Sequence, residues 1–238
     1  MPPSLVDVTG HPATAALLAL ADQRLPSGGH VHSGGVEQAV AHGLVSDAGS
    51  LATFLDRRLR SSGLVVAAVA AATVLAPATS IAALDAETDA RIPSPAQREA
   101  SRAQGRGLLR TARAAWAAPA PELPWSALGP RPHHPLVLGC AARAAGLDPA
   151  AAALVAAYLA VTGPSTAAQR LLALDPVQVA AVTIGLGDAI EDVAHRAATA
   201  AAACAARGLW QDLPDDGDPL LDLLAQRHAV RGDRLFAS

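Results

Sequence analysis

The chain has 238 residues, which suits one large domain or two small ones and is long enough to bury a sizeable core. Its net charge of −3 argues against a general nucleic-acid-binding protein. The basic residues are all arginine, so Schiff-base and pyridoxal chemistry, which need a lysine amine, are excluded. Alanine dominates the hydrophobic residues and favours helices that approach one another closely.

Proline positions mark where many of the helices begin. A good N-cap residue precedes proline at Ser94-Pro95, Asp148-Pro149, Asp175-Pro176 and Asp218-Pro219. No stretch alternates convincingly in the manner of a strand. We predict helices at about 11–21, 36–43, 48–62, 64–76, 80–91, 95–117, 136–145, 149–162, 165–174, 176–207 and 219–229. The predicted fold is all-α: one domain over residues 1–238, a compact bundle of about ten helices.

Between the first two predicted helices lies a glycine-rich loop, residues 22–38. Its glycine pairs, 28–29 and 34–35, can adopt positive φ at little cost, so the backbone can turn sharply twice. Because a loop this rich in glycine is costly to order, one held in a single shape usually has a use. A phosphate-binding P-loop is excluded, since Val36 follows Gly35 where that motif needs lysine. The alternative is a purely structural turn.

Two histidines in this loop, His30 and His32, are candidate metal ligands. In an extended segment they would face the same side and could share an ion. Two ligands leave most of a coordination shell to water, so we expect no tightly bound metal and no other tightly bound cofactor. Incidental histidines in a turn remain the competing interpretation.

An uncharged run extends from Ser61 to Leu84. It is mostly alanine and contains Pro77, and alanine is nearly neutral for membrane insertion. We therefore predict a buried pair of helices and no membrane association. The N-terminus lacks the form of a signal peptide, and Cys140 and Cys204 read as buried thiols, which together favour a cytoplasmic protein.

An arginine stripe follows one side of the predicted 95–117 helix, because four-residue steps nearly repeat the helical turn. It consists of Arg98, Arg102, Arg106, Arg110 and Arg113. Like charges at this spacing repel, and a plain solvated face more often mixes signs. The stripe is either a solvated face or a docking surface for an acidic or phosphate-bearing partner.

Residues 118–135 form the longest interruption, a proline-rich segment that we predict to be an ordered crossover packed through Trp125 and Leu128. The adjacent His133 and His134 could bind metal, but histidines in a surface loop are more often incidental. No Gly-x-Ser-x-Gly nucleophile elbow occurs, and neither cysteine has a histidine near it in sequence. We predict no catalytic residues, so the protein is not expected to be an enzyme.

The C-terminal tail, residues 230–238, follows the last predicted helix. Leu235 and Phe236 have nothing of the tail's own to bury them, and chain ends usually stay disordered unless something holds them. Burying each side chain contributes about 1.5–3 kcal/mol, whereas ordering the backbone costs about 1–2 kcal/mol per residue. We expect the tail to fray in the isolated protein and to order against a partner.

Three segments carry a resemblance. Leu17 to Val40 matches a leucine-rich helix followed by Leu-Pro-(small)-Gly-Gly-aromatic-x-(His or Tyr)-Ser-x-Gly-(Leu or Val)-Glu. The segment from Arg98 to Arg110 contains a Gln-Gly step before paired leucines. The chain then ends on a histidine followed by Arg-Leu-Phe-x-Ser, and a weaker match is Gln-Arg-Leu-Leu at 169–172. Together these segments resemble the urease accessory protein UreF family.

The resemblance implies an all-helical, non-enzymatic urease accessory protein that dimerises. It would bind UreD (also called UreH) and recruit the GTPase UreG, and the assembly would dock on apo-urease and deliver nickel. The complex, rather than this chain alone, would handle nickel. In the family the tail orders on UreD binding near the Gly-Gly loop, which would make His30 and Arg234 neighbours. The predicted partner-binding residues are Pro26, Gly28, Gly29, His30, His32, Ser33, Gly35, Glu37, Arg98, Arg102, Arg106, Arg231, Arg234, Leu235 and Phe236.

Two departures from the family pattern affect the contact between tail and loop. His30 stands where the family usually has an aromatic residue, and Ala229 stands where it has a glutamate. Two other functions compete with the docking protein. One is a direct activator of the UreG GTPase with an arginine finger, which can raise the rate by roughly 10³–10⁵. The other is a nickel-binding metallochaperone that uses His30 and His32.

Overall fold

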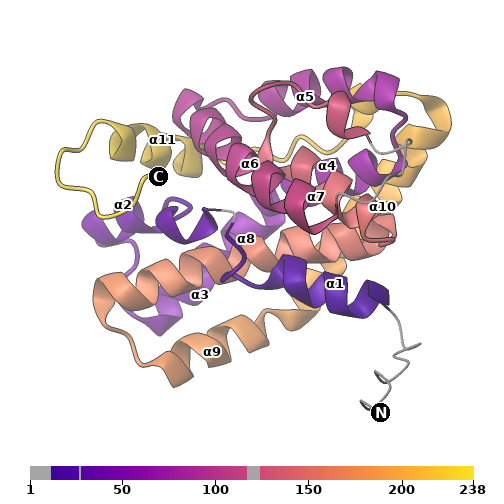
Figure 1. Ribbon diagram of the computed structural model, residues 1–238. Coiled ribbons are helices and arrows are strands. Elements are labelled where there is room, and N and C mark those ends of the chain that lie inside the picture. The colour runs from indigo at the N-terminus through magenta and orange to yellow at the C-terminus, as the bar shows by residue number, and fades with distance from the viewer. Residues whose placement is uncertain (1–11, 27, 117–123) are drawn as a thin grey trace, which may run out of the picture.

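The computed structural model describes residues 12–26, 28–116 and 124–238, and no strand occurs among them (Figure 1). The predicted flexible residues 1–10 and the first part of the 118–135 crossover lie outside these ranges. The helices are α1 Pro12–Ala21, α2 Val36–Ala41, α3 Ala48–Arg58, α4 Leu64–Leu75, α5 Ile81–Ala90, α6 Pro95–Ala115, α7 His134–Ala144, α8 Pro149–Leu172, α9 Pro176–Gly185, α10 Gly187–Arg207 and α11 Pro219–Ala229. The predicted all-α fold is confirmed.

Capping chemistry explains why several helices begin where they do. The side chains of Ser94, Asp148, Asp175 and Asp218 each accept a hydrogen bond from a backbone N–H in the first turn of α6, α8, α9 and α11, respectively. Each cap precedes a proline, whose missing N–H costs nothing at the first helical position. The four helix starts predicted from the sequence are therefore confirmed.

The core lies where α4 packs against α7, α8 and α10. Alanines fill most of these contacts and are almost wholly buried, so the helix backbones come close together. One close approach is at Gly139 of α7, where a Cβ atom would collide with the carbonyl oxygen of Ala70 and lie 2.6 Å from Cβ of Thr73, both in α4. Only glycine fits there. Cys140 and Cys204 are buried free thiols, as predicted.

Two helical runs, Ala48–Leu75 and Pro149–Leu172, are long and apolar enough to cross a membrane by length and composition alone. In each run 61% of the most apolar window is buried inside the fold. This burial is what core helices of an alanine-rich protein show. Of the pair of helices predicted within residues 61–84, α4 is buried as expected, whereas α5 buries Ile81 and Leu84 but exposes Ala82 and Ala83.

Three predicted helix boundaries were wrong. The two helices predicted at 48–62 and 64–76 continue into each other through a π-helical turn, Leu59–Gly63. The break predicted at residues 163–164 is absent, since α8 runs through Pro164. The long helix predicted at 176–207 divides into α9 and α10 at Leu186, between two glycines.

The described part of the proline-rich crossover is ordered. Leu128 is buried and Trp125 packs against the core, as expected. The crossover lies so close to α6 that a Cβ atom on Gly105 would collide with the carbonyl oxygen of Pro132. Gly105, the glycine of the Gln-Gly step, therefore permits the crossover to pass over α6. At the other end of the molecule the C-terminal segment ends beside α2 (Figure 1).

Candidate functional site

The Gly-Gly loop is held in one shape by positive φ angles. Gly28, Gly34 and Gly35 have φ of +80°, +61° and +91°. Gly34 is also confined in space, because a Cβ atom there would lie 2.8 Å from Cγ of Pro164 and 3.3 Å from Cζ of Arg58. The two sharp turns expected from the sequence are present, and Gly34 meets both a conformational and a steric requirement for glycine.

The C-terminal tail lies along this loop and bonds to its backbone. The amide of Ala237 donates to the carbonyl oxygen of Val31 at 2.7 Å, and the amide of Ser33 donates to the carbonyl oxygen of Ser238. The side chains meet as well, with Nδ1 of His32 2.5 Å from Oγ of Ser238. Loop and tail therefore form one unit within the chain.

Glu37, at the start of α2, is the centre of this unit. Its Oε1 accepts the amide N–H of Leu235 at 2.6 Å, and its Oε2 accepts the amide N–H of Phe236 at 3.1 Å. Nε2 of His228, at the end of α11, lies 2.6 Å from the same Oε2. Burial opposes ionisation of Glu37, but these three donors outweigh it and hold the pKa of the carboxyl below its usual value.

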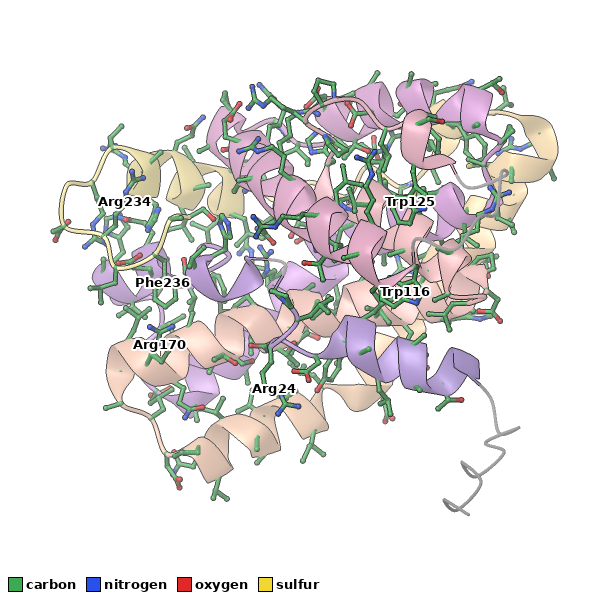
Figure 2. All side chains as sticks on the ribbon, viewed as in Figure 1. Arg24, Trp116, Trp125, Arg170, Arg234 and Phe236 are labelled. Atoms are coloured by element: carbon green, nitrogen blue, oxygen red, sulfur yellow. The ribbon has the colours of Figure 1, made fainter. Side chains whose placement is uncertain are left out.

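Phe236 anchors the tail in the core. It is only 6% exposed, and the guanidinium carbon of Arg170 in α8 lies 5.2 Å from the centre of its ring, a cation–π contact. Figure 2 shows the two side chains facing each other. The Gln-Arg-Leu-Leu segment of α8, recognised from the sequence as a weak match, thus supplies one side of the Phe236 pocket.

The prediction that the tail frays was wrong for this structure. That prediction compared the free energy gained by burying two apolar side chains with the cost of ordering the backbone. It did not include an acceptor for the amide groups of the tail. Glu37 supplies that acceptor inside the protein, and a buried hydrogen bond to a charged group contributes about 1.5–3 kcal/mol. In this structure the tail is docked on the loop and on Glu37 of the same chain.

Arg231 and Arg234 of the tail, both predicted to bind a partner, bond to other groups of this chain. Arg231 pairs with Asp233 at 2.9 Å and reaches Oε1 of Gln38 at 3.3 Å. Arg234 is exposed, and its NH1 group donates to the carbonyl oxygen of Ala229 at 3.4 Å. The side chain of His30 lies outside the described residues, so its expected proximity to Arg234 stays a prediction.

The arginine stripe of α6 does not form a single surface. Arg102 is only 16% exposed and pairs with Asp85 and Asp89 of α5, at 2.9 and 2.6 Å. Arg98 donates to the carbonyl oxygen of Ile92 at 2.6 Å. The carboxylates that α5 brings to the stripe are distant from it in the sequence. Arg98 and Arg102 are engaged within the chain, and their predicted part in partner binding stays a prediction.

The outer members of the stripe remain open. Arg106 and Arg110 are exposed and make no ion pair or hydrogen bond with any part of the chain that the structure describes. Arg113 donates to the carbonyl oxygen of Trp125 at 3.0 Å. Three arginines of the stripe are thus exposed, and two of them, Arg106 and Arg110, have guanidinium groups without a partner among the described residues.

Asp85, Asp89 and His133 form the one group of three potential metal ligands among the described residues. Nε2 of His133 lies 2.8 Å from Oδ1 of Asp89, and burial lowers the pKa of the His133 imidazole. The guanidinium of Arg102 already bonds to both aspartates. A cation at this position would meet that positive charge, so the group is better explained as a partly exposed ion-pair network around the buried His133.

Comparison with known proteins agrees with the resemblance seen in the sequence. The UreF family model matches residues 45–187. The chain is 55% identical over 226 residues to the urease accessory protein UreF of Mycolicibacterium vanbaalenii, covering 94% of this chain and 98% of the relative. It is 53% identical over 227 residues to UreF of Mycobacterium marinum, with coverage of 94% and 98%. The corresponding values for UreF of Mycobacterium tuberculosis H37Ra are 48% over 224 residues, with coverage of 94% and 98%. The chain therefore belongs to the UreF family of urease accessory proteins.

Proposed function

We propose that this protein is a non-catalytic docking protein of urease maturation. It binds UreD/UreH, recruits the GTPase UreG and brings both to apo-urease in the cytoplasm, so that nickel is delivered by the assembled complex. The relatives are named accessory proteins, not enzymes. The observation that carries the proposal is the docked tail. Its contact with the Gly-Gly loop joins two segments that are distant in the sequence into one surface.

That surface has the composition of a protein-binding site. Phe236 points inward, while its neighbour Leu235 is 79% exposed. Val230 is 81% exposed in the same segment, and Val31 of the loop is 41% exposed beside Ala237. Exposed apolar side chains held on a rigid backbone, with Arg234 at the edge, are typical of partner-binding surfaces. We assign this loop–tail surface, defined by Val31, Val230, Arg234 and Leu235, to UreD/UreH.

A second surface suits a homodimer. Helix α9 contains no charged residue, and its Val177 and Ile184 are 74% and 78% exposed. In a twofold dimer each surface patch contacts the same patch of the second copy. A patch with a net charge would repel that copy, whereas the uncharged face of α9 would not. Size-exclusion chromatography with light scattering tests this assignment: Ile184→Glu should convert a dimer into a monomer. A monomeric wild type would contradict it.

The free pair Arg106 and Arg110 is assigned to an acidic or phosphate-bearing partner, with UreG as the candidate. The same arginines are the residues available for an arginine finger, which is the competing function. Stimulation of purified UreG by this chain alone, lost in Arg106→Ala or Arg110→Ala, would favour the finger. Binding without stimulation favours docking.

Nickel binding by the isolated chain is the remaining alternative. His32 is engaged with Ser238 of the docked tail, so its replacement should disturb assembly first. We expect His30→Ala/His32→Ala to reduce UreD/UreH capture while weak nickel binding changes little in calorimetry. A tight one-to-one nickel site abolished by this double substitution would instead favour a metallochaperone.

The experiment that tests the proposal as a whole is co-purification of the full-length chain with UreD/UreH and UreG. Wild type should retain both, and Leu235→Glu should lose UreD/UreH while melting at the wild-type temperature. Failure of the wild type to retain either partner would contradict the docking function.

A further inference from the structure

Arg58 ends α3, directly before the π-helical turn Leu59–Gly63, and its side chain enters the interior beneath the Gly-Gly loop. The guanidinium lies against Gly34, whose missing Cβ leaves the space that the group occupies. A π-helical turn widens the backbone locally and occurs often at functional sites. Two unusual backbone features thus set the position of Arg58: the π-helical turn that follows it in the chain and the glycine that its guanidinium contacts.

One nitrogen of the guanidinium, Nε, has a structural role. Pro164 has no N–H, so the carbonyl oxygen of Ala160, four residues earlier in α8, lacks its helical donor. Nε of Arg58 donates to that oxygen at 3.2 Å. This bond explains why α8 passes through Pro164 without ending, and it fixes the orientation of the guanidinium plane.

The two terminal nitrogens of Arg58 have no acceptor among the residues that the structure describes. No carboxylate there pairs with them either. Burial alone lowers the pKa of Arg58, to about 10, so the group is still charged at neutral pH. Arg58 is partly buried, and a charge withdrawn from water is costly unless it is paired. None of the described residues supplies a counter-charge to it.

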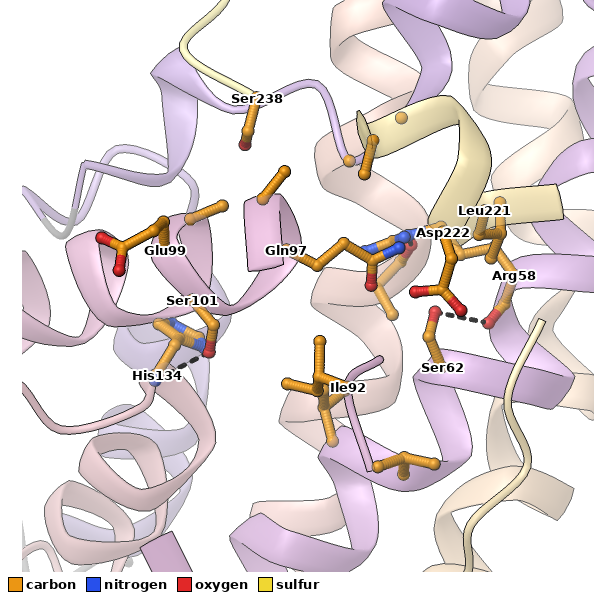
Figure 3. A pocket seen from close by; sticks show the side chains of 18 of the residues that line it. Arg58, Ser62, Ile92, Gln97, Glu99, Ser101, His134, Leu221, Asp222 and Ser238 are labelled. Carbon is orange, nitrogen blue, oxygen red and sulfur yellow. Dashed lines mark hydrogen bonds between the residues drawn. The ribbon is translucent and has the colours of Figure 1, made fainter. Parts of the chain in front are cut away.

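Arg58 is among the residues that line a cavity of about 560 Å³ between α3, α6 and α11 (Figure 3). Four carboxylate side chains line it, and three are engaged: Asp218 with Arg57, Asp222 with the amide of Ser94, and Glu99 with Arg131. The fourth, Asp216, is exposed. The cavity reaches the exposed residue Asp216, so a small solute can enter.

Gln97 of α6 adds a neutral donor. Figure 3 shows its side chain extending across the cavity toward the wall that carries Arg58, Ser62 and Asp222. Its amide group makes no hydrogen bond with any described residue. A guanidinium fork and a free amide that line the same cavity match an oxyanion, whose oxygens accept bonds from both.

We propose that Arg58 anchors a binding site for a small oxyanion, planar like a carboxylate or tetrahedral like phosphate, in the cavity beneath the Gly-Gly loop. Two oxygens of the anion accept bonds from the terminal nitrogens of Arg58. The anion supplies the missing counter-charge and stiffens the wall on which the loop–tail unit rests. This site is separate from the proposed docking function and does not depend on it.

Isothermal titration calorimetry of the full-length chain in Tris chloride, at constant ionic strength, tests the site. Sodium acetate, sodium phosphate and sodium sulfate are titrated separately, so that the planar and tetrahedral arms are distinguished. We expect saturable one-to-one binding of at least one of them. Arg58→Lys keeps the charge but loses the fork, so it should weaken that binding by about tenfold or more.

The matched control is Arg196→Lys, the same change at an exposed arginine of α10 outside the cavity, which should leave the affinity within about twofold. If Arg58→Lys does not fold, Gln97→Leu leaves the bond to Ala160 intact and should weaken binding by about fivefold. The absence of saturable binding by all three anions would overturn the proposal. Binding that both the Arg58 and the Gln97 variants retain in full would overturn it as well.

Discussion

The carboxylate of Glu37 and the imidazole of His228 meet at 2.6 Å although 191 residues separate them in the chain. Both side chains are almost completely buried. Their contact joins the start of α2 to the end of α11, and the same carboxylate receives two amides of the tail. One side chain thus sets the position of the C-terminus relative to the Gly-Gly loop.

Replacing Glu37 by glutamine should release the tail. The amide retains one oxygen but turns an –NH₂ group toward N–H donors, which leaves buried groups unsatisfied. We expect a loss of about 2–4 kcal/mol in the free energy of unfolding and rapid proteolysis after Arg231 or Arg234. Chemical denaturation and limited trypsin digestion measure the two effects.

The control for that change is Glu191→Gln on the exposed side of α10, which should alter the unfolding free energy by less than about 0.5 kcal/mol. If Glu37→Gln and Glu191→Gln behave alike in both assays, Glu37 does not hold the tail.

Acidification should loosen the tail in a defined direction. The pKa of Glu37 is lower in the folded protein than in the unfolded chain, where it is about 4.3. The stabilisation is therefore fully present above that unfolded value and is lost as the pH falls through the folded pKa. Amide hydrogen-exchange protection of Leu235 and Phe236 should hold from pH 7 to 5 and decline below about pH 4. Protection already lost between pH 7 and 6 would contradict the assignment.

The same substitution at two arginines of α6 should change the free energy of unfolding by very different amounts. Arg102→Glu places a negative charge against Asp85 and Asp89, so we expect a loss of at least about 2–3 kcal/mol in unfolding free energy. Arg106→Glu, one turn away and exposed, should change it by less than about 0.5 kcal/mol. Thermal melts of the two variants decide the matter, and equal melting temperatures would show that the α5–α6 ion pairs contribute nothing.

The bond between Arg58 and Ala160 predicts an energetic coupling with Pro164. Arg58→Met should cost less in a Pro164→Ala background, because an alanine there restores the helical donor to the Ala160 carbonyl. A double-mutant cycle measured by urea denaturation should give a coupling of about 0.5–1.5 kcal/mol. Additive costs would mean that the bond does not compensate for the proline.

Local chemistry in the sequence was sufficient for the helix starts, the turning glycines and the buried alanine-rich core. The caps at Ser94 and Asp148 are decided within four residues, and the φ of Gly35 depends on its missing side chain. The family resemblance also led us to expect the tail near the Gly-Gly loop, where the structure has it.

What the sequence did not reveal were relationships between distant residues. Nothing near Phe236 indicates that Glu37 accepts its amide, and nothing near Arg102 indicates that α5 carries its counter-charges. The continuation through Pro164 was missed because it involves a tertiary contact, the bond from Arg58 to Ala160. The break at Leu186 was missed although the glycines on both sides of it disfavour a continuous helix. Arg58 gave no signal beyond being one arginine among 18.

Binding of purified UreD/UreH to the full-length chain, measured by titration, tests the central claim most directly. Leu235 is exposed and makes no core contact through its side chain, so Leu235→Glu should weaken binding by at least about tenfold, or 1.4 kcal/mol, without lowering the melting temperature. Ile184→Glu on α9 should leave that affinity within about twofold. Wild-type affinity in the Leu235→Glu variant would show that the loop–tail surface is not where UreD/UreH binds.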